Sequence, residues 1–315
     1  MTRAGAVVDV GGTKVVSASS ASPENSRRWA TDVEHGADAL ADQISDALRF
    51  WEIRAGERAV VASAGYLDVG LGRVRRASNL PFIDYPLRDR LRELLGCRVE
   101  LVGDATAATV AELTHRSRRA HENGLYVTIS TGIGMGVVRE RRLDWLAGNG
   151  DRELGHVRVD QAPDAEICGC GRRGCLEAYG SGSSIVRRYA ELSRIDAVPL
   201  TSPDELTVSD VVRACDAGDV RARTVIGDAL GYLTTAIANA SRESEASVLV
   251  LGGGVMVHAG LFEPLRQRLL VETGSRISIE RSLFGEHSVL HGAAAICERD
   301  SEVVRALGED WVGDR

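Results

Sequence analysis

The 315-residue sequence has few aromatic side chains and no long apolar run. Phe, Trp and Tyr make up 4% of it, whereas 34 residues are Gly, which favours nucleotide-handling α/β proteins with tight loops over aromatic-rich binding modules. No stretch of about 18 apolar residues is present to span a bilayer, and residues 1–10 lack the apolar core of a signal peptide. We therefore expect a cytoplasmic protein with no membrane partner.

The chain is acidic overall, and its basic residues do not form one extended cationic region. The formal net charge is −7, and the basic residues are scattered. A protein that neutralises a phosphate backbone presents a continuous cationic surface, so nucleic acid is not an expected partner. The composition, 44% hydrophobic and 26% charged, is that of a globular chain long enough for one large or two medium domains.

Alternating apolar segments and turns predict an α/β chain whose opening pattern recurs. A β-branched run at 6–10, a glycine turn at 11–14 and a return at 15–16 predict antiparallel strands. The same strand, loop and strand pattern recurs at 125–138. Further predicted strands are 59–62, 99–102 and 248–251, and predicted helical segments are 36–51, 86–95, 105–113, 208–241 and 291–307.

A basic, polar stretch at 114–123 is the best candidate for a domain boundary. We predict an N-terminal α/β domain at 1–117, with a C-terminal helix at about 291–315 packing back on it. Residues 118–290 are predicted to form a second α/β domain.

Three glycine-rich turns each follow a predicted strand, at 9–14, 131–136 and 252–254. Glycine lets the backbone approach a phosphate closely, and successive N–H groups form anion-binding concavities. Turn chemistry alone also explains a single glycine hairpin. None of the three matches the P-loop or Rossmann glycine pattern, so neither of those nucleotide folds is expected.

Asp104 follows a predicted strand and opens a predicted helix. One interpretation is an N-cap or first-turn acid that complements the helix dipole. The other is a carboxylate at the carboxyl edge of the sheet, positioned to accept a proton from an attacking hydroxyl. The residues alone leave both open.

The strongest single motif is a set of three cysteines and one histidine. Four soft ligands around a glycine-rich loop at 168–175, here called the cysteine knuckle, suit a closed, tetrahedral structural Zn²⁺ site. A redox or unligated cysteine cluster is the alternative. Cys97, Cys215 and Cys297 stand apart and are interpreted as small buried side chains. The predicted zinc ligands are His156, Cys168, Cys170 and Cys175.

Taken in order, these motifs resemble those of the ROK family (repressors, open reading frames and sugar kinases) of the actin-like ATPase superfamily. The match spans nearly the whole chain, and its pair of a Glu-x-Gly-His motif and a cysteine knuckle is highly specific. The matching segments are 9–14, 79–81, 103–105, 131–136, 153–156, 168–177 and 251–254.

The resemblance implies a two-domain, ribonuclease-H-like α/β fold with an interdomain cleft that binds ATP and Mg²⁺ at the glycine turns. It makes Asp104 the general base, and it implies that His156 contacts the acceptor as well as binding zinc. The implied acceptor-binding residues are Gly65, Asn79, Gly103, Asp104, Glu153, His156 and Glu177. The implied residues near ATP and Mg²⁺ are Asp9, Gly11, Gly12, Thr13, Lys14, Thr131, Gly132, Gly134, Gly253 and Gly254.

The resemblance implies an ATP-dependent sugar kinase, with a homodimer as its expected assembly, that phosphorylates the 6-hydroxyl of a hexose or hexose-like acceptor. Family sugar kinases usually carry Asn immediately before the catalytic Asp, and here Gly103 stands in that place. We expect an acceptor modified at the third ring position, such as the amino sugar kanosamine. Glucose, another hexose and a C7-cyclitol are alternatives, because Gly103 also simply leaves room for a water molecule.

A sugar-responsive repressor of the same family is the alternative from another functional class. Such repressors carry a helix-turn-helix region before the first phosphate motif, whereas here Asp9 arrives almost at once. A sensor without catalytic activity would be expected to have lost Asp104 or the glycine turns. We therefore favour the kinase.

Overall fold

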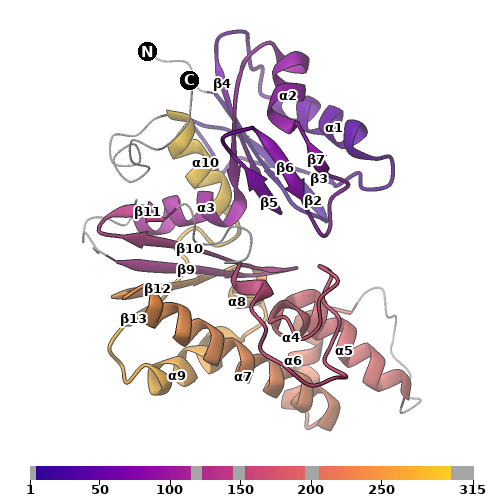
Figure 1. The fold of residues 1–315 in the computed structure, drawn as a ribbon, viewed down its shortest axis with the longest axis vertical. Coiled ribbons are helices and arrows are strands. Elements are labelled where there is room, and N and C mark those ends of the chain that lie inside the picture. Colours follow the sequence, from indigo (N-terminus) through magenta and orange to yellow (C-terminus); the bar gives the residue numbers. More distant parts are fainter. Residues whose placement is uncertain (1–4, 115–122, 145–152, 196–205, 299–315) are drawn as a thin grey trace. The chain divides into compact units, whose positions relative to one another are not determined.

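The chain divides into two compact units in the computed structural model (Figure 1). The structure describes residues 5–114, 123–144, 153–195 and 206–298. Unit 1 comprises residues 1–120, 138–145 and 287–315, and unit 2 comprises residues 121–137 and 146–286. The domain boundaries expected from the sequence, 117/118 and 290/291, stay predictions.

Unit 1 is built on a five-stranded sheet in the order β3-β2-β1-β4-β8. Strands β1, β2 and β3 pair antiparallel, whereas β1, β4 and β8 are parallel to one another. The strands are β1 (Ala6–Val10), β2 (Lys14–Ser19), β3 (Arg27–Ala30), β4 (Arg58–Ser63) and β8 (Arg98–Gly103). The predicted antiparallel opening is confirmed.

Both faces of the unit 1 sheet are buried. Val8 and Val61 belong to the core that contains Leu40 and Ile44 of helix α1 (Ala37–Arg49). Their neighbours Val7 and Val60 point to the opposite face and are also fully buried. Helices α3 (Asp104–Thr109) and α10 (Ser288–Glu298) contact strands of this sheet, while α2 (Leu87–Leu95) packs beside α1. Burial on both faces explains why these strands read as continuous apolar runs.

Four strands within residues 5–114 are absent from the sequence-based prediction. Strand β3 is an edge strand whose arginines are exposed, so it shows no apolar alternation. The other three form a small antiparallel sheet of three- and four-residue strands, too short to show a period of two. They are β5 (Tyr66–Asp68), β6 (Arg73–Arg76) and β7 (Ile83–Tyr85).

Two predicted helices of unit 1 differ in detail. The helix expected at 105–113 begins one residue earlier, at Asp104, and continues as a π-helix over Val110–Thr114. The last helix, expected at 291–307, begins at Ser288 and is described as far as Glu298. The rest of that prediction lies outside the described residues.

A second five-stranded sheet repeats the strand order of the first. It runs β11-β10-β9-β12-β13, so in both sheets the first three strands in sequence lie in reverse order, followed by the fourth and fifth. Residues 138–145, which hold β11 and the end of β10, are grouped with unit 1, and the rest of this sheet lies in unit 2. Strands β9, β12 and β13 are parallel. The strands are β9 (Gly124–Ile129), β10 (Ile133–Arg139), β11 (Arg142–Asp144), β12 (Val248–Gly252) and β13 (Ser278–Arg281). The recurrence predicted from the glycine turns thus extends to the whole sheet.

The helices of unit 2 correct the prediction of one amphipathic stretch at 208–241. That stretch is two helices, because Gly218 adopts a left-handed φ of 97° and Asp219 caps the second helix by accepting from Arg221 N–H. Among the described helices, none is both long and apolar enough to cross a membrane. The helices are α4 (Glu177–Gly180), α5 (Gly182–Ile195), α6 (Val208–Asp216), α7 (Val220–Glu243), α8 (Gly254–His258) and α9 (Phe262–Glu272), with 3₁₀ turns at Leu154–His156 and Gly285–His287.

Candidate active site and metal centre

Three strands of unit 1 end at one edge of the sheet. Val10 of β1 is in register with Ser63 of β4, which is in register with Gly103 of β8. Because these strands are parallel, the segments that follow them meet at this edge, the usual site of ligand binding in α/β folds. The glycine turn after β1, Gly65 after β4 and Asp104 after β8 are therefore brought together.

Asp104 is close enough to Asp9 at this edge to influence the charge of Asp9. Burial raises the pKa of Asp9 to about 7, the Asp104 carboxylate adds to the shift, and Lys14 partly offsets it. Two neighbouring carboxylates repel each other, and carboxylate oxygens are the ligands that Mg²⁺ prefers. The donor set of this edge therefore fits a divalent cation.

Asp104 lies where both interpretations drawn from the sequence require it, and its role as a base stays a prediction. It is the first residue of α3, and its Oδ1 accepts a hydrogen bond from Ala105 N–H at 2.7 Å. Gly103, not Asp104, occupies the N-cap position. The carboxylate thus lies in the first turn of the helix and also at the carboxyl edge of the sheet.

The first glycine turn is held by a residue that sequence reasoning missed. Gly11 N–H donates to Lys14 O at 3.0 Å and closes the hairpin. Thr31, which follows β3, donates from Oγ1 to Gly11 O at 2.7 Å and from its N–H to Thr13 O at 3.3 Å. Strand β3 was not predicted, so nothing in the sequence pattern connected Thr31 with this turn.

Two glycines at this edge allow close contacts with distant parts of unit 1. A Cβ on Gly12 would lie 2.5 Å from Asn79 Cβ, so the first turn packs directly against Asn79. Gly65 has a φ of 106°, and a Cβ there would lie 2.7 Å from Ala77 Cβ. Glycine is therefore required at both positions.

Unit 2 has a corresponding edge after β9 and β12. These strands are parallel, and they lead into Thr131–Gly132 and into Gly253 respectively. Gly253 has a φ of 87°, and a Cβ there would lie 2.3 Å from Ile129 O, so only glycine fits. The turn after β9 is shorter than predicted, because β10 begins at Ile133 and Gly134 lies within that strand. Gly254 is the first residue of α8.

Glu177 connects the second glycine turn with the cysteine knuckle. Its Oε2 accepts a hydrogen bond from Ile133 N–H at 3.0 Å. A Cβ on Gly132 would lie 2.7 Å from this oxygen, and one on Gly155 would lie 3.2 Å from it. The carboxylate is therefore held between the turn at 131–132 and the 3₁₀ turn that carries His156.

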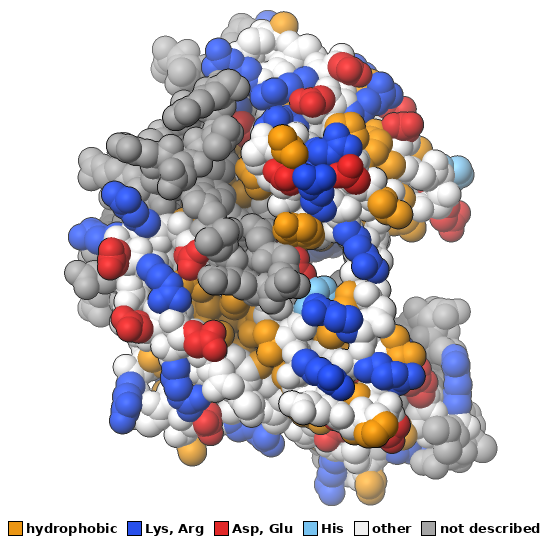
Figure 2. Space-filling model, in the orientation of Figure 1, with side chains coloured by type: hydrophobic (Ala, Val, Ile, Leu, Met, Phe, Trp, Pro, Cys, Tyr) orange, Lys and Arg blue, Asp and Glu red, His pale blue; other side chains and the backbone are white. Residues whose placement is uncertain are grey.

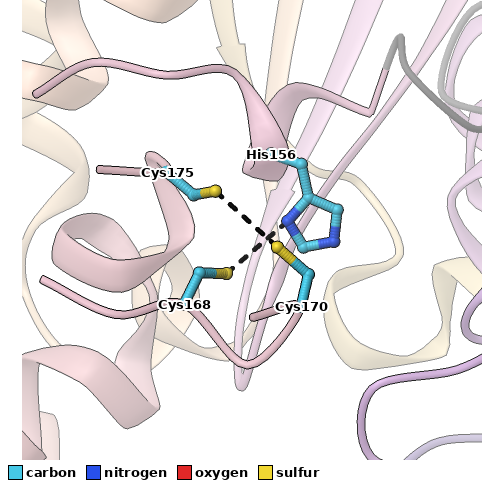
Figure 3. A group of neighbouring side chains, drawn as sticks. All are labelled: His156, Cys168, Cys170 and Cys175. Atoms are coloured by element: carbon cyan, nitrogen blue, oxygen red, sulfur yellow. Dashed lines mark hydrogen bonds between the residues drawn. The ribbon is translucent and has the colours of Figure 1, made fainter. Parts of the chain in front are cut away.

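The three cysteines and the histidine converge on one point (Figure 3). Cys170 Sγ lies 3.8 Å from Cys175 Sγ, and Cys168 Sγ lies 3.7 Å from His156 Nδ1. Zn–S bonds of about 2.3 Å in a tetrahedron place neighbouring sulfurs about 3.8 Å apart, whereas a disulfide needs about 2.05 Å. All three cysteines are free thiols, so their geometry fits a zinc ion and not a disulfide.

The knuckle backbone explains the spacing of its glycines. Gly171 and Gly174 have φ values of 87° and 76°. A Cβ on Gly174 would lie 1.9 Å from Asp160 O, so no other residue fits there. Burial opposes ionisation of the Cys170 thiol, but hydrogen bonds from the backbone and side chain of Arg172 outweigh it and lower its pKa. The loop thus favours the metal-binding thiolate form at Cys170, whereas burial raises the pKa of the Cys168 and Cys175 thiols.

Glu153 orients the histidine of this cluster. The Nδ1 atom of His156 faces the thiols, while Nε2 lies 3.2 Å from Glu153 Oε2. A metal-binding imidazole commonly donates its other N–H to a carboxylate, which fixes the tautomer and raises ligand basicity. Glu153 therefore contacts the metal site as well as being a predicted acceptor ligand.

The structure places the predicted site residues in two groups, each described within its own unit. Unit 1 carries Asp9, Gly11, Gly12, Thr13, Lys14, Gly65, Asn79, Gly103 and Asp104. Unit 2 carries Thr131, Gly132, Gly134, Glu153, His156, Cys168, Cys170, Cys175, Glu177, Gly253 and Gly254.

Comparison with known proteins identifies the family. The profile of the ROK family matches residues 5–300, and the chain belongs to this family. The N-acetylmannosamine kinase of Salmonella typhimurium is 30% identical over 302 residues, covering 93% of this chain and 98% of that protein. The glucokinase of Thermotoga maritima is 32% identical over 251 residues, covering 76% and 78%.

Solved structures of the same family share the fold. A ROK family glucokinase from Streptomyces griseus, determined with glucose and AMPPNP, matches with a TM-score of 0.79 at 25% identity, covering 95% of this chain and all of that one. The ROK hexokinase of Thermus thermophilus matches with a TM-score of 0.69 at 29% identity, covering 93% and 97%. The predicted actin-like ATPase fold is thus confirmed.

Proposed function

We propose that this ATP-dependent sugar kinase transfers the γ-phosphoryl group of ATP to the 6-hydroxyl of a hexose modified at its third ring position. The kinase class rests on relatives and solved structures that are themselves sugar kinases. The observation that carries the proposed site is the edge of unit 1, where Asp104 adjoins Asp9 and the first glycine turn.

The proposed reaction uses Asp104 as the general base. Its carboxylate accepts the proton of the attacking hydroxyl, whose oxygen bonds to the γ-phosphorus while the bond to the ADP oxygen breaks. Phosphoryl transfer depends mainly on positioning and charge neutralisation, which the glycine turns and Lys14 would supply. Mg²⁺ beside Asp9 would neutralise phosphate oxygens.

Replacing Asp104 by asparagine tests this assignment. Asn keeps the size of the side chain but cannot take the proton, and general-base assistance is worth about 10²–10⁴-fold. We expect Asp104→Asn to lower kcat by at least about 10²-fold with little change in the KM for ATP. A variant with wild-type circular dichroism and near-normal kcat would contradict the role of Asp104.

Gly103 supports an acceptor that differs from glucose. Its φ of −68° and ψ of 142° are accessible to any residue, so the backbone does not require glycine. A Cβ there would lie 3.2 Å from Thr106 Oγ1, a contact that a small rotation of the threonine relieves. The missing side chain therefore leaves space that a substituent on the acceptor can fill.

Substrate competition tests this specificity. We expect kcat/KM for kanosamine (3-amino-3-deoxyglucose) to exceed that for glucose, and Gly103→Asn to reverse the order by supplying an amide that hydrogen-bonds a 3-hydroxyl. The panel should include N-acetylmannosamine, the acceptor named in a relative, and a C7-cyclitol. A preference for glucose in the unaltered enzyme would exclude a C3-modified acceptor without affecting the assignment of Asp104.

The homodimer implied by the family resemblance is also a proposal. Light scattering coupled to size-exclusion chromatography checks it: a dimer has twice the 33.7 kDa of the single chain.

A further inference from the structure

A pocket of about 300 Å³ lies beside the cysteine knuckle, within unit 2. Three of its lining side chains are arginines, and its size is at the lower end of small-molecule sites. On the face shown in Figure 2, blue and red side chains are generally interspersed, so a pocket with three guanidinium groups is a local concentration of charge. The lining residues are His156, Arg158, Arg172, Arg173 and Cys175.

Backbone contacts hold two of these arginines in place. Arg158 Nε donates to Asp160 O at 3.2 Å, and Arg173 Nη1 donates to Ala165 O at 2.8 Å. A carbonyl oxygen orients a guanidinium without neutralising its charge. Both groups are thus positioned in advance, which lowers the entropic cost of binding a ligand.

Acidic groups beside the pocket balance the charge of its arginines. A zinc ion with three thiolates and a neutral imidazole carries one net negative charge. The Glu153 carboxylate beside His156 adds a second. The Asp160 carboxylate, whose pKa is lowered by the hydrogen bond from Tyr179 and in smaller part by the charge of Arg158, adds a third. These negative charges equal the charges of the three arginines, so the case for a ligand rests on the arrangement of the guanidinium groups and not on an excess of positive charge.

We infer that this pocket binds a small ligand through its phosphate group. The planar guanidinium fork matches phosphate oxygens in a bidentate arrangement, and a phosphate monoester carries a charge of about −1.5 to −2 at pH 7. The phosphate belongs either to a sugar phosphate, such as a product of the proposed reaction, or to inorganic phosphate. This binding site is additional to the kinase activity and does not depend on the identity of the acceptor.

Isothermal titration calorimetry of the full-length, zinc-replete protein without nucleotide tests the inference. Inorganic phosphate and glucose 6-phosphate are titrated separately, with and without saturating neutral acceptor. Arg158→Gln removes one exposed guanidinium and is expected to raise the Kd of the bound anion by about tenfold or more. If saturating acceptor weakens anion binding, the bound species is a sugar phosphate that also occupies the acceptor site. If the acceptor has no effect on anion binding, the pocket is a separate phosphate site.

Arg268→Gln is the matched control, because Arg268 is an exposed arginine of α9 and does not line the pocket. Its Kd should equal that of the unaltered protein. Arg158→Lys keeps the charge without the fork and should show an intermediate Kd, which preserves the test if the glutamine variant loses zinc. Absence of saturable binding up to about 10 mM, or equal weakening by Arg158→Gln and Arg268→Gln, would overturn the inference.

Discussion

At the scale of single residues, Asp9 couples folding to pH at the carboxyl edge of the unit 1 sheet. The unfolded chain loses the Asp9 proton near the ordinary pKa of 3.8, whereas burial and Asp104 raise the folded-state pKa to about 7. Between these values the folded state holds more protons than the unfolded state, so rising pH destabilises the fold. The stabilisation is fully present below about pH 4 and is lost as the pH rises through about 7.

Asp9→Asn should therefore stabilise the protein at high pH while impairing catalysis. We expect the variant to gain about 2–4 kcal/mol at pH 8, measured by thermal unfolding without Mg²⁺ or nucleotide, and to gain nothing at pH 4. Asp46→Asn is the control, since that side chain is 77% exposed. If the thermal stability of Asp9→Asn and of the unaltered protein depended on pH in the same way, the raised pKa of Asp9 would be contradicted.

At the scale of elements, Tyr179 joins α4 to the segment that precedes the cysteine knuckle. Its hydroxyl donates to Asp160 Oδ2 at 2.5 Å and accepts from Glu166 N–H at 2.9 Å. Burial and the Asp160 carboxylate raise the pKa of Tyr179 to about 12, so it remains a donor at physiological pH. Its ring packs against Tyr232 with centroids 4.7 Å apart.

Tyr179→Phe removes both hydrogen bonds and leaves the ring. Losing them should cost about 1–3 kcal/mol in local stability. We expect the variant to release zinc to a chelator faster than the unaltered protein, followed with a colorimetric zinc indicator. Tyr232→Phe is the matched control, since it alters the neighbouring ring without touching these two bonds. If the two variants release zinc at the same rate, the two hydrogen bonds of Tyr179 do not stabilise the metal site.

Residue patterns predicted some elements and missed others for physical reasons. Strands β1, β4, β8, β9 and β12 were found because burial forces apolar runs on them. Strand β3 and the β5–β7 sheet are short and partly exposed, and their pairing is set by distant residues. The cysteine motif predicted that four side chains converge on a metal ion, and the geometry supports this. The hydrogen bond from Thr31 to the first glycine turn could not be predicted, because it depends on strand β3, which has no recognisable local pattern.

At the scale of the whole molecule, the metal site and the second glycine turn are connected. Glu177 lies two residues after Cys175 of the knuckle, and its carboxylate accepts a hydrogen bond from Ile133 N–H. Loss of order in the knuckle would therefore also disturb the turn after β9. We therefore expect zinc removal to raise the KM for the acceptor by about tenfold or more and to weaken nucleotide binding to a lesser degree.

Metal analysis and kinetics of Cys168→Ser test this coupling. That variant should lose zinc and acceptor affinity together. Cys215→Ser is the control, because Cys215 lies on α6, outside the cluster. Full activity in a protein shown to be free of zinc would contradict the coupling.

The shared strand order of the two sheets has an evolutionary consequence. Asp9 is the next-to-last residue of β1, and the equivalent residue of β9, also followed by a glycine turn, is Thr128. A chain formed by duplication of one ancestral half would begin with two equivalent edges. Only one of the two edges carries an acid at this position, so the two halves are not chemically interchangeable even though their strand orders match.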